Sequence, residues 1–114
     1  MNAQKKERIA AYKERKVVGG VYAIKNTLSG RRMIEATTDI RGSKNRFDFA
    51  QKNNLCVNKK IEVEWKRWGA GSFVFEVIEE LEKESAQTLE KFQADVAALK
   101  ELWLEKLSGE DVSR

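Results

Sequence analysis

GGVYAIKNTLSGRRMIEATTD, residues 19–39, contains two β-type runs on either side of a loop of turn-forming residues. VYAIK and RRMIEATT both alternate in side-chain character, and the NTLSG between them suits a hairpin loop. We expect strands at Val21–Asn26 and Arg32–Thr37, with Gly30 in the left-handed conformation. This hairpin is the feature on which the prediction of the fold depends.

The residues after the hairpin predict two helices and a third strand. Asp39 is a suitable N-cap for a helix that reaches Ala50, although Gly42 and its neighbours favour an irregular first turn. Asn58 is expected to cap a second, short helix. Residues 72–81 read as a strand with apolar side chains on both faces, which predicts that it is covered on both sides.

Helical patterns also occur at both ends of the chain. Ser85 begins a predicted helix over residues 85–107, whose apolar side chains recur at intervals of three and four and include Phe92, Val96, Leu99 and Trp103. Residues 3–16 predict a basic helix. The fold class expected is α+β: a three-stranded antiparallel sheet flanked by helices. We divide the chain into a basic N-terminal helix or arm (1–18), one domain (19–109) and a loose tail (110–114).

Composition limits the class of protein. The chain has 114 residues, of which 41% are hydrophobic and 35% charged, as expected for one domain with a charged surface. It contains no apolar run long enough to span a membrane and no signal-peptide pattern. Cys56 is the only cysteine, which excludes an internal disulfide and predicts a reducing, cytoplasmic location.

The two parts of the chain carry opposite charge. Residues 1–67 contain 17 Lys and Arg against 7 Asp and Glu, a charge of +10. Residues 68–114 contain 5 against 11, a charge of −6. This segregation predicts a basic face that attracts a polyanion such as DNA or RNA, although both faces could simply be solvated.

Three segments carry a resemblance to a known family. GVYAIKNTLSGRRMIEAT (20–37) resembles the opening hairpin of the GIY-YIG nucleases, and its loop is similar to that of the phage intron-homing endonucleases. NKKIEVEWKRWGAGSFVFEVIEEL (58–81) resembles the second helix, glycine turn and third strand, and ALKELWLEKL (98–107) resembles the last helix. The resemblance covers about residues 19–107.

The resemblance implies a phosphodiesterase site made of two tyrosines, a helix arginine and a glutamate that holds one divalent metal. Tyr22 matches the first tyrosine, but Met33 stands at the second and Glu35 at the glycine of the second tripeptide. The arginine position falls on Ser43, with Arg46 one helical turn later and Arg41 as the second candidate. The resemblance therefore retains Tyr22 and Arg46 as catalytic candidates.

Lys100 stands where the metal-binding glutamate belongs. A charged lysine has no lone pair to offer a metal, so we expect no cofactor here. Mg²⁺ is expected only if Glu35, Asp39 or Glu101 supplies a new ligand. If the last helix crosses the second strand as in the family, Lys100 should instead form an ion pair with Glu35.

Basic residues on the elements that face nucleic acid in the family predict a binding surface. They are Lys25, Arg31, Arg32, Arg41, Lys44, Lys59, Lys60, Lys66 and Arg67, together with Arg46 and Lys52, and the arm could add Lys5, Lys6, Arg8, Lys13, Arg15 and Lys16. Trp65 and Trp68 are candidates for core packing or for base stacking.

Three functions remain open at this point. The first is an impaired nuclease-fold protein that binds DNA or RNA. The second is an active metal-dependent endonuclease, and the third is a protein–protein module that uses the acidic helix over 85–107. The degenerate site favours the first.

Overall fold

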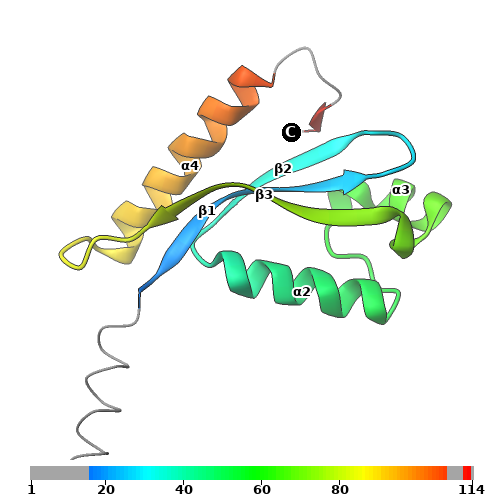
Figure 1. The fold of residues 1–114 in the computed structure, drawn as a ribbon, viewed down its shortest axis with the longest axis horizontal. Helices are drawn as coiled ribbons and strands as arrows, with labels where there is room; N and C mark the ends of the chain where they lie inside the picture. Colours follow the sequence, from blue (N-terminus) through cyan, green and yellow to red (C-terminus); the bar gives the residue numbers. More distant parts are fainter. Residues whose placement is uncertain (1–15, 108–111, 114) are drawn as a thin grey trace, which may run out of the picture.

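A computed structural model describes residues 16–107 together with Val112 and Ser113 (Figure 1). The predicted basic helix over residues 3–16 therefore lies outside the described residues, apart from Lys16. The elements are β1 (Val18–Asn26), β2 (Arg32–Thr37), α2 (Ile40–Lys52), η1 (Lys59–Ile61), α3 (Glu62–Trp68), η2 (Ala70–Ser72), β3 (Phe73–Glu82), α4 (Leu89–Lys106) and β4 (Val112–Ser113).

The sheet has the strand order β3-β1-β2-β4, and β1 is antiparallel to both β2 and β3. The predicted hairpin is confirmed, with Tyr22 opposite Glu35 and Ile24 opposite Met33. Its loop is fixed by the buried Asn26, whose Oδ1 accepts hydrogen bonds from the backbone N–H groups of Leu28 and Ser29 at 3.0 and 3.3 Å. Gly30 has φ +79°, as the loop pattern predicts.

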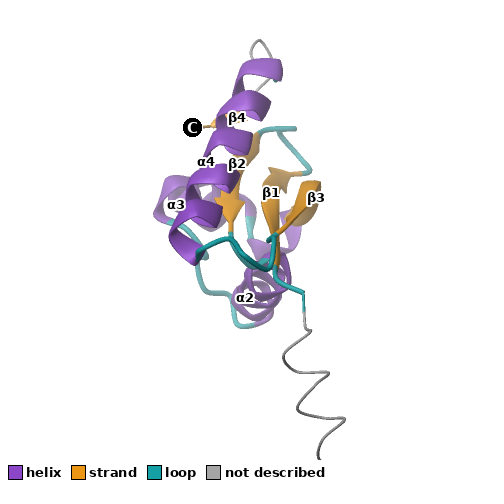
Figure 2. Cartoon of the chain, turned by 90° about the vertical axis from the view of Figure 1, so that its left-hand side faces the viewer, coloured by secondary structure: helices purple, strands orange, loops and turns teal. Residues whose placement is uncertain are grey.

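The hairpin is packed on both faces because α2 and α4 lie on opposite sides of the sheet (Figures 1 and 2). Val21, Ala23 and Ile34 form one core with Leu104 of α4. Ile24 and Met33 belong to the other, with Phe47 of α2 and Trp65 of α3. The central strand β1 therefore sends alternate side chains into two separate cores.

The third strand differs from its prediction. β3 forms one edge of the sheet among the described strands, and some of its apolar side chains are not covered by other elements. Val74 and Val77 are 39% and 45% exposed, whereas Phe73 is buried. An apolar run on both faces of an edge strand imitates the pattern of a central strand, and only the strand order distinguishes the two.

The helix starts show both agreement and difference. Asp39 caps α2 as predicted, by accepting from the Gly42 N–H at 3.0 Å, and the first turn is regular rather than irregular. The last helix begins at Leu89, four residues later than predicted, because the Thr88 side chain caps it by accepting from the Lys91 N–H. Phe92 and Val96 are buried as expected, Leu99 and Trp103 pack against the core, and Leu89 is exposed.

Part of the predicted loose tail adds to the sheet. Val112 and Ser113 pair in parallel with Arg32 and Met33 of β2 (Figure 1). Within the described part of the chain, no helix has the length and apolar character needed to cross a membrane.

Candidate functional site

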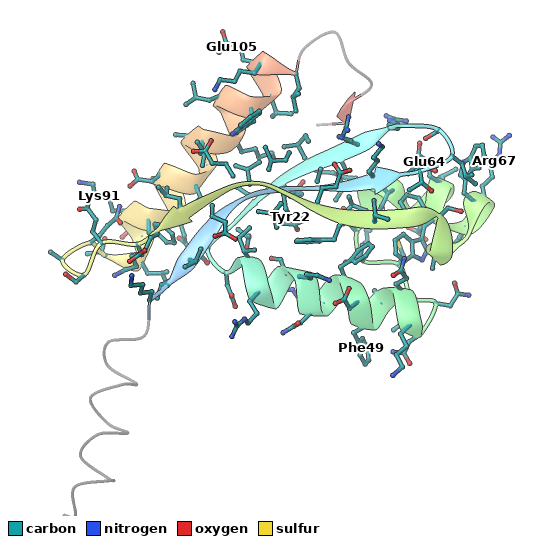
Figure 3. The ribbon with its side chains drawn as sticks, in the orientation of Figure 1. Tyr22, Phe49, Glu64, Arg67, Lys91 and Glu105 are labelled. Atoms are coloured by element: carbon teal, nitrogen blue, oxygen red, sulfur yellow. The ribbon has the colours of Figure 1, made fainter. Side chains whose placement is uncertain are left out.

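Tyr22 lies at the centre of the candidate site, between the sheet and α2 (Figure 3). Its ring stacks on Phe75 of β3, with centroids 4.6 Å apart and planes 19° apart. The side chain is half-buried, and Glu35 stands opposite it on β2. The hairpin register thus brings Tyr22 and Glu35, which the resemblance aligns with the first tyrosine and the second glycine of the family's tripeptides, onto neighbouring strands.

Ser43 connects the tyrosine to the displaced arginine. Its hydroxyl is buried, donates to Thr37 Oγ1 at 2.8 Å and accepts from Arg46 Nη2 at 3.1 Å. It also acts on the Tyr22 hydroxyl, whose pKa it lowers. Arg46, the arginine candidate one turn after Ser43, therefore lies close to Tyr22, and Ser43 stands between the two side chains.

Gly42 makes room for this arrangement. A Cβ at Gly42 would overlap the Asp39 carboxylate that caps α2 and would lie 3.5 Å from Arg46 Nη1. The capping carboxylate and the guanidinium therefore lie over the same turn of the helix. Asp39 is engaged as a cap at this position, which argues against its predicted alternative role as a metal ligand.

The pKa of the Tyr22 hydroxyl is raised above its ordinary value of 10.0. Burial is the main cause, and the negative charge of Glu35 adds to it. The Ser43 side chain and the positive charge of Arg46 act in the opposite direction without cancelling the effect. At neutral pH the hydroxyl is protonated, so it can donate a hydrogen bond to an anion but cannot serve as a phenolate base.

The predicted ion pair between Lys100 and Glu35 is present. Lys100 Nζ lies 3.7 Å from Glu35 Oε1, and both side chains are 20% exposed. A second ammonium, from Lys60, lies 2.8 Å from the same oxygen. Its contact with Glu35 was not predicted, because the two residues are 25 positions apart and meet only through the packing of η1 beside β2.

The residues at this site do not fit a divalent metal. Lys100 places an ammonium beside the one carboxylate that the hairpin supplies, and an ammonium repels a cation. Glu101 is exposed and shares a surface hollow with Ala98, Leu102 and Glu105 of α4 itself. Among the described residues, no group of three or more His, Cys, Asp and Glu side chains could hold a metal ion.

A groove of about 470 Å³ opens beside Tyr22. It is bounded by α2 and the loop that follows it, and its lining includes Ser43, Arg46, Phe49, Leu55 and Cys56. Phe49 and Leu55 are 63% and 51% exposed, which the sequence pattern did not predict. Phe49 falls one position off the buried face of α2 defined by Phe47 and Ala50, so its exposure could have been read from helical spacing.

Several predicted nucleic-acid-binding residues are engaged in ion pairs. These pairs, with their N–O distances, are Lys60–Glu35 (2.8 Å), Arg31–Glu64 (3.3 Å), Arg32–Glu76 (3.2 Å), Lys44–Asp48 (3.0 Å) and Lys66–Glu62 (3.0 Å). The exposed pairs are worth about 0–1 kcal/mol each, so a phosphate can displace their carboxylates, whereas the Glu35 carboxylate is only 20% exposed. Lys25, Arg41, Lys52 and Lys59 make no ion pair with another described residue.

The two tryptophan candidates have different environments. Trp65 is buried and packs against Phe47 and Phe73, so it belongs to the core. Trp68 is 37% exposed, and the Arg67 guanidinium lies 5.4 Å from its ring centroid. Of the two, Trp68 alone is accessible for stacking.

Comparison with known proteins gives matches at the level of structure. No family model matches the sequence, and no curated protein matches it significantly. The catalytic domain of the homing endonuclease I-TevI matches with a TM-score of 0.58 and 18% identity, over 81% of this chain and 90% of that one. A mutant form of the same catalytic domain matches with a TM-score of 0.57 and 19% identity, over 82% of this chain and 84% of that one.

The match extends over most of the chain and comprises a three-stranded antiparallel sheet with three helices. At 18–19% sequence identity, the comparison shows a similarity of fold alone. The described chain has the α+β fold of a GIY-YIG endonuclease catalytic domain.

Proposed function

We propose that this chain binds nucleic acid through the site around Tyr22 and the neighbouring basic residues, without cleaving it. The observation that carries the proposal is the 3.7 Å contact between Lys100 Nζ and Glu35 Oε1. A fixed ammonium occupies the position at which the family resemblance calls for a metal-holding carboxylate. A cation remains at the site, but it is one that the chain itself supplies.

Charge supports binding at this site. Lys60, Lys100 and Arg46 contribute three positive charges against the two negative charges of Glu35 and Asp39, which leaves a formal charge of +1. A site of that sign attracts a phosphodiester without a bound metal. The protonated Tyr22 hydroxyl adds a hydrogen-bond donor for a phosphate oxygen.

The site lacks the groups that hydrolysis of a phosphodiester would need. Hydrolysis of a phosphodiester requires stabilisation of the charge that develops on the phosphate and on the leaving oxygen, which a metal supplies in such sites. The chain contains no histidine to act as a general base, and Tyr22 keeps its proton at neutral pH. Met33, at the second tyrosine position, is buried in the core at 1% exposure and carries no hydroxyl.

Binding is tested by fluorescence anisotropy with labelled DNA and RNA, in EDTA and at low salt. We expect the full chain to bind in EDTA, and Arg46→Gln to lower affinity about three- to tenfold through loss of a charge-assisted phosphate contact. Lys91→Gln is the matched control, because it removes one exposed positive charge from the first turn of α4, at a distance from Tyr22 (Figure 3). Absence of binding at low salt, or equal losses in the two variants, contradicts the proposal.

A further inference from the structure

The groove beside Tyr22 has two chemically different ends. Its volume of about 470 Å³ lies in the range of about 300–1,000 Å³ that is typical of small-molecule sites. The Tyr22 hydroxyl, Ser43 and Arg46 form a polar end with a positive charge. Phe49 and Leu55 form an apolar end that is open to solvent.

Arg46 and Phe49 are placed for simultaneous contact with one ligand. They are three residues apart on α2, so their side chains are neighbours on the helix surface. The hydrogen bond to Ser43 uses one of the five N–H donors of the guanidinium, which leaves others for a phosphate. The Phe49 side chain stands out from α2 on the side away from the sheet (Figure 3).

The exposed apolar surface of Phe49 is unfavourable in water, and a bound ligand would cover it. Its neighbour Phe47 is buried in the core at 3% exposure, whereas Phe49 is 63% exposed beside the half-exposed Leu55. Apolar surface of this kind beside a cationic group matches a ligand with a flat apolar body and an anionic end. Aromatic side chains in such positions stack on nucleobases whatever their sequence.

We infer that this groove binds one unstacked nucleotide, with its phosphate at Arg46 and Tyr22 and its base against Phe49 and Leu55. The inference deepens the proposed function and rests on it, since it names the form of nucleic acid that the site takes. A base that is stacked within a duplex cannot lie in the groove, so single strands, frayed ends and unpaired positions are preferred. A free nucleoside monophosphate offers the same chemistry.

Cys56 gives a direct test of occupancy. It is the only cysteine of the chain, it is exposed, and it lines the groove. We expect adenosine 5′-monophosphate at millimolar concentration, and a short single-stranded oligonucleotide at lower concentration, to slow modification of this thiol by a disulfide reagent. Inorganic phosphate and the matching duplex should protect it much less, because neither places a base in the groove.

Two variants make the test specific. Phe49→Ala should abolish the protection and weaken single-strand binding about fivefold or more, whereas Phe49→Tyr, which keeps an aromatic ring, should retain both. Since Phe49 is exposed, neither change disturbs the core. Protection of Cys56 that survives Phe49→Ala, equal protection by single strand and duplex, or a dimer that Phe49→Ala dissociates without any effect of nucleotide, each overturns the inference.

The two proposals fail in different ways. If anisotropy shows no binding to any nucleic acid while the monophosphate still protects Cys56, the groove takes a free nucleotide and the proposed function is wrong. If nucleic acid binds with the expected dependence on Arg46 but Cys56 reacts at an unchanged rate, the proposed function stands and the nucleotide groove is wrong.

Discussion

Glu35 connects the groups of the candidate site to one another. Its carboxylate contacts the ammonium groups of Lys60 and Lys100, and its charge acts on the hydroxyl of Tyr22 across the strand pair. Half-buried ion pairs are sensitive to the loss of one partner, because the remaining charge then stays in a poorly solvated place. Glu35 and Arg46 act on the Tyr22 pKa in opposite directions, so substitutions at these two positions should shift that pKa in opposite directions.

The pKa of Tyr22 gives one such prediction. Glu35→Gln removes a neighbouring negative charge and should lower the Tyr22 pKa, whereas Arg46→Gln removes a positive charge and should raise it further. Titration of phenolate absorbance measures both, in a Tyr12→Phe background that leaves Tyr22 as the only tyrosine. Shifts of the same sign in both variants contradict the description of the site.

The raised pKa also sets the pH dependence of stability. A pKa that is higher in the folded state means that folding favours the protonated phenol. The stabilisation is fully present below the unfolded value of 10.0 and is lost as the pH rises through the folded value. Tyr22→Phe should therefore reduce the fall in the free energy of unfolding above pH 10.0, as measured by urea unfolding at a series of pH values.

Lys100 can be exchanged for a residue that offers oxygen ligands to a metal. In a Lys60→Gln background, which removes the second ammonium from Glu35 Oε1, Lys100→Glu places a carboxylate beside Glu35, so that the two side chains offer oxygen ligands of the kind that Mg²⁺ prefers. We expect titration calorimetry to detect Mg²⁺ binding in this variant and none in the native chain. Lys91→Glu makes the same change of charge at the exposed start of α4 and should not create a site; equal binding in both variants argues against a metal position at Lys100.

At the scale of elements, the central strand β1 depends on close backbone approach. Gly20 has φ +147°, and a Cβ there would overlap the carbonyl oxygen of Glu79 on β3. A Cβ at Gly19 would likewise overlap the carbonyl oxygen of Thr37 on β2. Immediately after this pair, a register shift between Val21 and Tyr22 changes the pairing of β1 with β3, so that Val21 pairs with Glu79 and Tyr22 with Val77.

Gly20→Ala should consequently destabilise the fold, by about 1–3 kcal/mol. Gly71→Ala is the control, since a Cβ at Gly71 meets no atom within 4 Å. Urea unfolding of the two variants measures the difference in the free energy of unfolding. Equal stability would mean that the close approach at Gly20 is absent in solution.

Local signals explain which elements were predictable. The hairpin, the Asp39 and Asn58 caps and the last helix depend on residues within a few positions of one another, and all are present. The edge position of β3, the contact of Lys60 with Glu35 and the groove at Phe49 depend on how distant elements pack. The Lys100–Glu35 pair was predictable only because the family resemblance placed the last helix across the second strand.

At the scale of the whole molecule, the charge of +10 on residues 1–67 should make binding strongly dependent on salt. Several basic residues are held in exposed ion pairs, and these pairs weaken at the same salt concentrations as phosphate contacts do. A handful of phosphate contacts gives a slope of about −4 to −6 for log affinity against log salt. Anisotropy over a series of salt concentrations measures it, and a slope near zero contradicts a binding mode based on charge.

The most direct test of the account measures binding and cleavage in the same samples. Supercoiled plasmid is incubated with the purified native chain in Mg²⁺ or in EDTA, and affinity and nicking are recorded together. Because Lys100 supplies the cation of the site, we expect equal affinity in the two conditions, at matched ionic strength, and no nicking in either. Mg²⁺-dependent nicking that Tyr22→Phe abolishes would contradict it.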